Sequence, residues 1–144
     1  MAKVLCAVDE SKAATAAVAA AIEFSRKHDL DLRLVGIVRP VFGVTQPAYG
    51  EQVRRFREVE FALVQAARAA REAGLKPGIG IRAGYPEQEL VREAEATGAG
   101  DIFLGRTRGL VAATLRRRPR LDVLRVTQAS GGRRETRRYL EEAA

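Results

Sequence analysis

The chain has 144 residues, of which 47% are hydrophobic and 30% charged, and its formal net charge is +7. That length suits one ordinary globular domain. No apolar run approaches the roughly 20 residues that span a bilayer, and the N-terminal residues lack a signal-peptide pattern, so we expect a cytoplasmic protein without a membrane anchor. One cysteine and one histidine exclude an intrachain disulfide and a metal cluster built from these two residue types.

The first third of the sequence predicts two buried strands joined by a helix. Residues 3–8 form a short continuous apolar run, which is typical of a strand covered on both faces, and Cys6 within it is expected to be a buried hydrophobic side chain. An alanine-rich segment with helical apolar spacing follows, and Ser11 suits its N-cap. Residues 32–38 predict the second buried strand.

Two helices and a weaker strand are predicted in the middle of the chain. Two prolines and two glycines indicate a loop over residues 39–50, and residues 51–74 carry the apolar stripe of a long amphipathic helix that stops at a glycine. The strand around residues 79–81 is less apolar and contains glycines, which favours the edge of a sheet. Pro86 then begins a helix that runs to Gly98.

The last third holds a buried strand, a glycine loop and an arginine-rich segment. Residues 101–105 predict the strand, and the loop of residues 105–109 follows it. Residues 110–118 could hold two helical turns, and the β-branched alternation of residues 121–128 predicts a fifth strand. Residues 133–144 predict a short C-terminal helix.

Strands that alternate with helices predict an α/β domain with a parallel sheet and helices on both faces. We expect five strands in a domain of residues 1–128, then a basic linker and the C-terminal helix over residues 129–144. In such sheets ligands bind beyond the carboxyl ends of the strands. Asp9, which ends the first strand, could accept hydrogen bonds from a ribose or an adenine, or it could simply be an acid that the start of a helix favours.

The loop GRTRG offers a second group of candidate ligand-binding residues. Gly105 and Gly109 would let backbone N–H groups approach phosphate oxygens. Arg106 and Arg108 could pair with a phosphate bidentately, and Thr107 could donate its hydroxyl. The loop matches neither the P-loop nor the dinucleotide-binding pattern, and many strand-to-helix turns need a glycine for backbone reasons alone.

The positive charge is concentrated after this loop begins. Residues 1–104 hold 14 Lys and Arg against 14 Asp and Glu, whereas residues 105–138 hold 11 Arg against two acids. Such a segment could contact nucleic acid in a salt-dependent way, or it could be a solvated basic surface. No helix-turn-helix pattern, zinc spacing or row of aromatic residues accompanies it, so we do not expect sequence-specific nucleic-acid binding.

Two segments of the chain resemble the universal stress protein family. Residues 3–38 are similar to its first strand, first helix and second strand, and residues 83–110 are similar to its third helix, fourth strand and glycine loop. The resemblance covers roughly residues 2–128. It implies the strand order 3-2-1-4-5, and it places Asp9 where that family has an adenosine-contacting aspartate. We include Val38, at the end of the second strand, among the ligand-binding residues. The resemblance also implies a homodimer formed through the fifth strand, which would be an exposed edge.

The glycine loop departs from the pattern of the family's ATP-binding members. These show Gly-x-x-Gly and, further on, a Gly followed by Ser or Thr. Here Gly105 matches the first glycine, but Arg108 stands at the second position and Gly109 comes one residue late. Residues 116–119, RRRP, replace the closing pair. The arginines could therefore attract phosphates, or their bulk could fill the pocket.

Three functions remain open at this point. The first is a cytoplasmic stress-response or signalling protein that senses ATP, another adenine nucleotide or another anion. The second is a dimeric protein-interaction module that binds no nucleotide and uses the edge strand and the basic C-terminal segment. The third is an accessory domain of a transporter or kinase. No Ser/His/Asp or Cys/His constellation is present, so we do not expect an enzyme.

Overall fold

The computed structural model describes residues 3–9, 11–43, 45–105, 123–128 and 134–138. Their strands are β1 (Lys3–Val8), β2 (Asp31–Val38), β3 (Gly78–Ala83), β4 (Ala99–Gly105), β5 (Val123–Gln128) and β6 (Arg134–Arg138). Their helices are α1 (Lys12–His28), α2 (Gln46–Glu72) and α3 (Pro86–Thr97).

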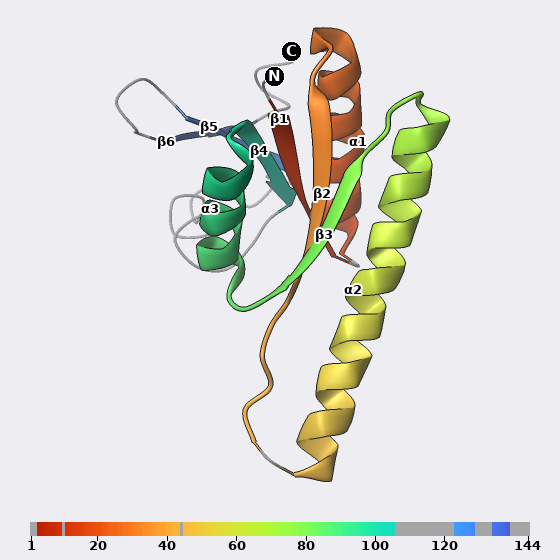
Figure 1. Cartoon of the computed structure of the whole chain (residues 1–144), viewed down its shortest axis with the longest axis vertical. Coiled ribbons are helices and arrows are strands. Elements are labelled where there is room, and N and C mark those ends of the chain that lie inside the picture. The colour runs from red at the N-terminus through yellow and green to blue at the C-terminus, as the bar shows by residue number, and fades with distance from the viewer. Residues whose placement is uncertain (1–2, 10, 44, 106–122, 129–133, 139–144) are drawn as a thin grey trace.

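The described strands form one sheet in the order β3-β2-β1-β4-β5-β6 (Figure 1). β1 to β4 pair in parallel, and a helix joins each of these strands to the next. β1 lies between β2 and β4, and Val4, Leu5 and Cys6 are fully buried, which explains the continuous apolar run in the sequence. The predicted α/β class and the order of the first four strands are confirmed.

The prediction for the fifth strand was wrong in two respects. β5 pairs with β4 antiparallel, with Leu104 opposite Leu124, and β6 pairs with the other side of β5. β5 is therefore an inner strand, and β3 and β6 are the edges of the described sheet. The apolar pattern of a strand does not encode its direction, which depends on the connection, and the connecting residues 106–122, with the predicted turns of 110–118, lie outside the described residues.

The predicted C-terminal helix is also wrong where the structure describes it. Residues 134–138 form β6, although arginine and glutamate have good helix propensity. Propensity is a weak preference, and pairing with β5 provides the main-chain hydrogen bonds that a short isolated helix would have to make alone.

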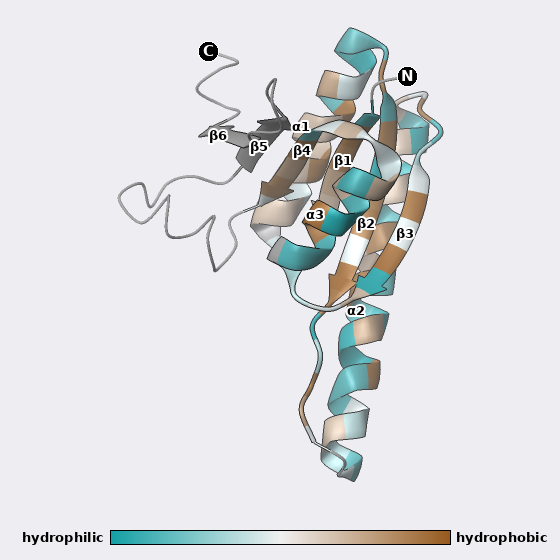
Figure 2. Ribbon diagram, turned by 60° about the vertical axis from the view of Figure 1, so that its left-hand side comes forward, coloured by the Kyte–Doolittle hydropathy of each residue, from teal (hydrophilic) through white to brown (hydrophobic). Residues whose placement is uncertain are grey.

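The helices cover both faces of the sheet, as predicted. Side chains alternate along each strand, so Cys6 belongs to the core under α1 and α2, whereas Leu5 belongs to the core under α3. Phe103 is fully buried on the first face and contacts Phe24 of α1, with 5.3 Å between ring centroids. Figure 2 shows α3 in front of the sheet and α2 behind it.

The helix boundaries follow from local capping. Ser11 caps α1 as predicted, because its Oγ accepts a hydrogen bond from Ala14 N at 3.1 Å. α2 begins at Gln46, earlier than predicted, because Thr45 caps it and Pro47 occupies the first turn, where a missing N–H is tolerated. None of the described helices combines the length and apolarity needed to cross a membrane.

The two halves of α2 are anchored differently. The buried residues of this helix, from Val59 to Ala70, all lie in its second half. The first half extends beyond the end of the sheet (Figure 1). The first half of α2 therefore forms ion pairs between neighbouring turns instead of burying side chains in the core.

Candidate functional site

A hollow of about 520 Å³ lies at the carboxyl ends of β1 and β2, between α2 and the start of α3. We call it the strand-end hollow. Asp9 and Val38, the two candidates from the first two strands, both line it. Pro86 and Leu90 of α3 complete the apolar part of its lining. The structure therefore brings two of the predicted ligand-binding residues into one cavity.

Asp9 is exposed and directly follows β1. Ser11 N donates a hydrogen bond to its Oδ1 at 2.7 Å, so the carboxylate is held by the turn that starts α1. Within the described part of the chain Oδ2 has no hydrogen-bond partner. Asp9 thus supports the start of the helix and still presents an acceptor oxygen to the hollow, so the two roles considered from the sequence are compatible.

Val38 ends β2 and is buried. Its carbonyl oxygen accepts a hydrogen bond from Gly84 N at 3.0 Å, which ties the end of β2 to the turn before α3. Val38 therefore contributes apolar surface to the hollow that Asp9 also lines.

Gly105 has a structural reason to be glycine. A Cβ at this position would lie 2.5 Å from the carbonyl carbon of Ala13 and 2.6 Å from Ala14 N, so the first turn of α1 rests directly on the end of β4. Gly105 does not line the strand-end hollow. The other loop candidates, Arg106, Thr107, Arg108 and Gly109, lie outside the described residues.

Three arginines that the sequence analysis did not select line the same hollow: Arg39, Arg54 and Arg55. We call them the arginine wall. Arg54 Nε donates to Glu51 Oε2 at 2.8 Å and Arg54 also pairs with Glu58, while Arg55 Nε lies 3.1 Å from Glu51 Oε1. Hydrogen bonds from Arg54 and then Arg55 lower the pKa of Glu51 to about 2.

The sequence did contain a signal for this wall. Residues 51, 54, 55 and 58 have the i,i+3 and i,i+4 spacing that places charges on one helix face. Because the same helix carries an apolar stripe, the charged residues beside that stripe would normally be interpreted as facing solvent. α2 begins at Gln46, before these residues, and its charged face lines the hollow at the ends of β1 and β2.

Hydrogen bonds hold the loop after β2 against α2. Val41 N donates to Gln52 Oε1 at 2.8 Å, and Arg55 Nη1 donates to the carbonyl oxygen of Arg39 at 3.5 Å. The arginine wall and the three carboxylates that line the hollow, Asp9, Glu51 and Glu58, carry equal and opposite formal charge. An anionic ligand would therefore compete with Glu51 and Glu58 for guanidinium groups that are already oriented.

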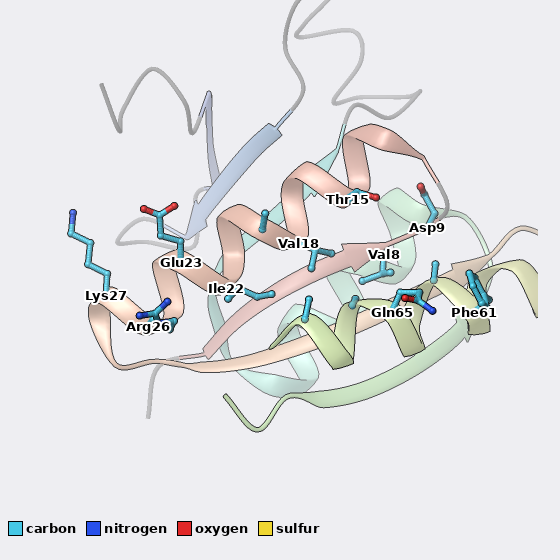
Figure 3. Close-up of a pocket in the computed structure, with 14 residues that line it drawn as sticks. Val8, Asp9, Thr15, Val18, Ile22, Glu23, Arg26, Lys27, Phe61 and Gln65 are labelled. Carbon is cyan, nitrogen blue, oxygen red and sulfur yellow. The ribbon is translucent and has the colours of Figure 1, made fainter. Parts of the chain in front are cut away.

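A second, more apolar space lies beside this hollow. A groove of about 960 Å³ between α1 and α2 meets the strand-end hollow at Val8 and Asp9. Figure 3 shows Asp9 at one end of this groove and Arg26 and Lys27 at the other. Between these ends the groove is lined mainly by apolar side chains, among them Val18, Ile22 and Phe61.

Cys6 lies in the core beneath this region. Burial, and to a lesser degree the charge of Asp9, raises the pKa of its thiol well above the usual range. The thiol is therefore protonated and inaccessible, as expected from the sequence. Within the described residues no group of three or more metal-ligating side chains occurs.

The sheet with β1 at its centre and the hollow at the strand ends define a doubly wound α/β domain. Residues 1–127 match the model described as the Universal stress protein family. The chain therefore belongs to the universal stress protein family. None of the curated proteins matches the chain.

Solved structures share the fold at low sequence identity. A universal stress family protein from Burkholderia pseudomallei is 23% identical, with a TM-score of 0.68 over 83% of this chain and 90% of that one. A universal stress protein from Archaeoglobus fulgidus, in complex with dAMP, is 21% identical, with a TM-score of 0.62 over 82% and 91%. One from Arabidopsis thaliana, with AMP bound, is 17% identical, with a TM-score of 0.58 over 81% and 85%.

Proposed function

We propose that this protein is a cytoplasmic stress-response or signalling protein that binds an adenine nucleotide in the strand-end hollow. The observation that carries the proposal is the meeting of Asp9 and Val38 in one cavity of about 520 Å³, a size within the range of small-molecule sites. Similar proteins were solved with AMP, dAMP and cAMP, which supports an adenine nucleotide as the ligand class.

Each residue of the hollow has a distinct role in this proposal. The second carboxylate oxygen of Asp9 accepts a hydrogen bond from the ribose or the adenine amino group, and Val38 packs against the base. The arginine wall meets the phosphate, with Arg54 and Arg55 exchanging part of their contact with Glu51 for the ligand. The loop residues Arg106 to Gly109 stay proposed phosphate contacts.

Binding is tested by a thermal-shift and calorimetric series with ATP, ADP, AMP, dAMP and cAMP. Mass spectrometry of small molecules released from the denatured protein comes first. A ligand at 100 times its dissociation constant should stabilise the fold by about 2.7 kcal/mol. No retained nucleotide and no shift with any of the five would overturn the proposal.

Asp9→Asn is the sharpest variant for this test. Asparagine can still accept the hydrogen bond from Ser11 N, so the start of α1 is kept while the charge and the second acceptor are lost. We expect weaker nucleotide binding with unchanged stability. Asp31→Asn is the matched control, because Asp31 is exposed at the opposite end of the sheet.

A second candidate function is a protein-interaction module that binds no nucleotide. The structural explanation of Gly105 favours it, because that glycine does not require a phosphate. The homodimer expected from the resemblance stays a prediction. A dimer that added a strand to the described sheet would have to use β3 or β6, since β5 is paired on both sides.

A further inference from the structure

The groove between α1 and α2 has an apolar floor and a low rim. Its floor includes three buried side chains, Val8 of β1 and Val18 and Ile22 of α1. The exposed positions that border it include Ala19 of α1 and Ala69 of α2. Because alanine side chains end at Cβ, the two helices leave an open space of about 960 Å³, near the upper end of the range for small-molecule sites. The groove therefore has room for a ligand that is itself largely apolar.

The two ends of this groove carry opposite charge. Arg26 and Lys27 lie at one end and Asp9 lies at the other (Figure 3). Neither Arg26 nor Lys27 forms an ion pair with another described residue. The Glu23 carboxylate lines the same end and offsets only one of the two positive charges. An anionic group is therefore favoured at the Arg26 end of the groove and disfavoured at the Asp9 end.

The Asp9 end of the groove also offers an apolar surface. Asp9 Oδ1 accepts a hydrogen bond from Ser11 N at 2.7 Å, and the same carboxylate lines the strand-end hollow, so it already serves other contacts. Phe61 borders the groove toward this end and is 65% exposed (Figure 3). A ligand lying beneath this ring would remove part of its surface from water. The apolar end of a ligand is therefore expected beside Phe61, and its anionic end beside Arg26.

The length of the groove indicates the size of such a ligand. Along α1 the lining runs from Thr15 to Lys27, and at about 1.5 Å of rise per residue this distance is about 18 Å. An extended saturated chain advances about 1.25 Å per carbon, so about 14 carbons span the same distance. The shape, the apolar floor and the charge at one end therefore fit a straight aliphatic chain with a single anionic head.

We propose that this groove binds a free long-chain fatty acid, with its carboxylate at Arg26 and Lys27 and its chain along the apolar floor toward Phe61. Arginine and lysine form charge-assisted hydrogen bonds with a carboxylate, and these fix the orientation of the ligand. Removal of the chain from water supplies most of the binding free energy. The groove shares only Val8 and Asp9 with the strand-end hollow, so this site goes beyond the proposed nucleotide site and does not depend on it.

The first test is isothermal titration calorimetry of the delipidated full chain with decanoate, laurate and myristate, each below its critical micelle concentration. Each CH₂ group removed from myristate should weaken binding about fourfold, equivalent to about 0.8 kcal/mol. Tetradecylammonium has the same chain with the opposite charge and should bind more weakly than myristate. No binding of myristate, an affinity that does not rise with chain length, or tighter binding of tetradecylammonium would overturn the proposal. Binding to vesicles that contain myristate, with none of the monomeric acid, would also overturn it.

The second test fills the groove. Ala19 is exposed at its rim, so Ala19→Phe places a ring over the floor without adding volume to the core. We expect this variant to bind myristate at least tenfold more weakly than the wild type. Ala96→Phe is the matched control, because Ala96 is an exposed alanine of α3 and does not line the groove. Unchanged affinity in Ala19→Phe, or an equal loss in Ala96→Phe, would overturn the assigned groove.

The third test locates the carboxylate and needs no change in the groove floor. The double variant Arg26→Gln, Lys27→Gln should bind myristate about tenfold more weakly, while binding of 1-tetradecanol, which has no charge, stays the same. Arg68→Gln with Arg71→Gln is the matched control, because it removes the same charge from exposed positions of α2 that do not line the groove. Equal losses in the two double variants, or an equal loss for the alcohol, would overturn the assigned head-group site.

Discussion

The guanidinium of Arg33 on β2 lies over Gly80 of β3, where a Cβ would come within 2.6 Å of Arg33 Nη2. This arrangement extends Arg33 across the neighbouring strand to Glu93 of α3, which also pairs with Arg82. α3 is thus held to the β2–β3 part of the sheet by ion pairs, while its apolar residues Leu90 and Ala94 pack on the core.

Gly80→Ala should weaken this ion-pair network. The new methyl group would displace the end of the Arg33 side chain, which is flexible, so we expect a loss of about 1 kcal/mol in the free energy of unfolding. Urea denaturation measures it. Gly50→Ala is the control: a Cβ there meets nothing within 4 Å, and the change should stabilise α2 by about 0.5–1 kcal/mol. Equal effects would contradict the role of Gly80.

Gly105→Ala should cost more, since the added methyl would meet the backbone of Ala13 and Ala14 and not a side-chain end. We expect a loss of about 1–3 kcal/mol without any nucleotide, as for other overpacked sites. Urea denaturation of the ligand-free protein is the measurement, and Gly100→Ala, in open space, is the control. Unchanged stability would contradict this packing explanation and would favour ligand contact as the reason for a glycine at position 105.

Glu93 should make stability fall in acid. Burial alone would raise the pKa of this carboxyl, but hydrogen bonds from Arg33 and Arg82 outweigh burial and hold it below its ordinary value. The carboxylate therefore stabilises the fold fully above the unfolded pKa of about 4.3, and that stabilisation is lost as the pH falls through the folded pKa.

Glu93→Gln should lower stability by about 1–3 kcal/mol at pH 7, because two charge-assisted hydrogen bonds are weakened. It should also flatten the dependence on pH below about 5. Denaturant titrations at several pH values test both effects. Glu72→Gln, at the exposed end of α2, should leave the pH profile unchanged.

Arg54→Gln should separate phosphate recognition from base recognition. If the arginine wall meets the phosphate, affinity for AMP should fall about tenfold, equivalent to about 1.4 kcal/mol, while binding of adenosine stays the same. Isothermal titration calorimetry with both ligands makes the comparison. Arg68→Gln changes an exposed arginine of the same helix away from the hollow and should alter neither affinity.

Cys6 should be inert in the native protein. Its thiol is buried and its pKa is raised, so a thiol reagent should label it only after unfolding. Mass spectrometry of protein treated with iodoacetamide, with and without urea, tests this. Rapid labelling of the native fold would show that β1 opens locally.

The sequence was most informative where local chemistry and burial agree. Buried apolar runs identified β1, β2 and β4, and Ser11 and Pro86 marked the starts of α1 and α3. The sequence was least informative where the neighbouring strand determines the direction or the conformation of a segment. The direction of β5 depends on its main-chain pairing with β4, and the strand conformation of residues 134–138 depends on their pairing with β5.

Part of the candidate site could be predicted from the sequence. Asp9 and Val38 could be selected because strand ends meet at one edge of a parallel sheet. For Arg54 and Arg55 the spacing indicates only that they share one charged helix face, because their approach to that edge depends on the length of α2 and on the path of the preceding loop. No local pattern specifies either.

The overhanging first half of α2 has a consequence for how the hollow responds to a ligand. This half, up to Glu58, contributes no buried residue and still carries two of the three wall arginines. Segments held by ion pairs and solvent-exposed hydrogen bonds open at lower free energy than segments packed in a core. Its amides should therefore exchange with solvent before those from Val59 onward. A nucleotide held by Arg54 and Arg55 should slow that exchange, so ligand occupancy and helix order become two measures of one equilibrium.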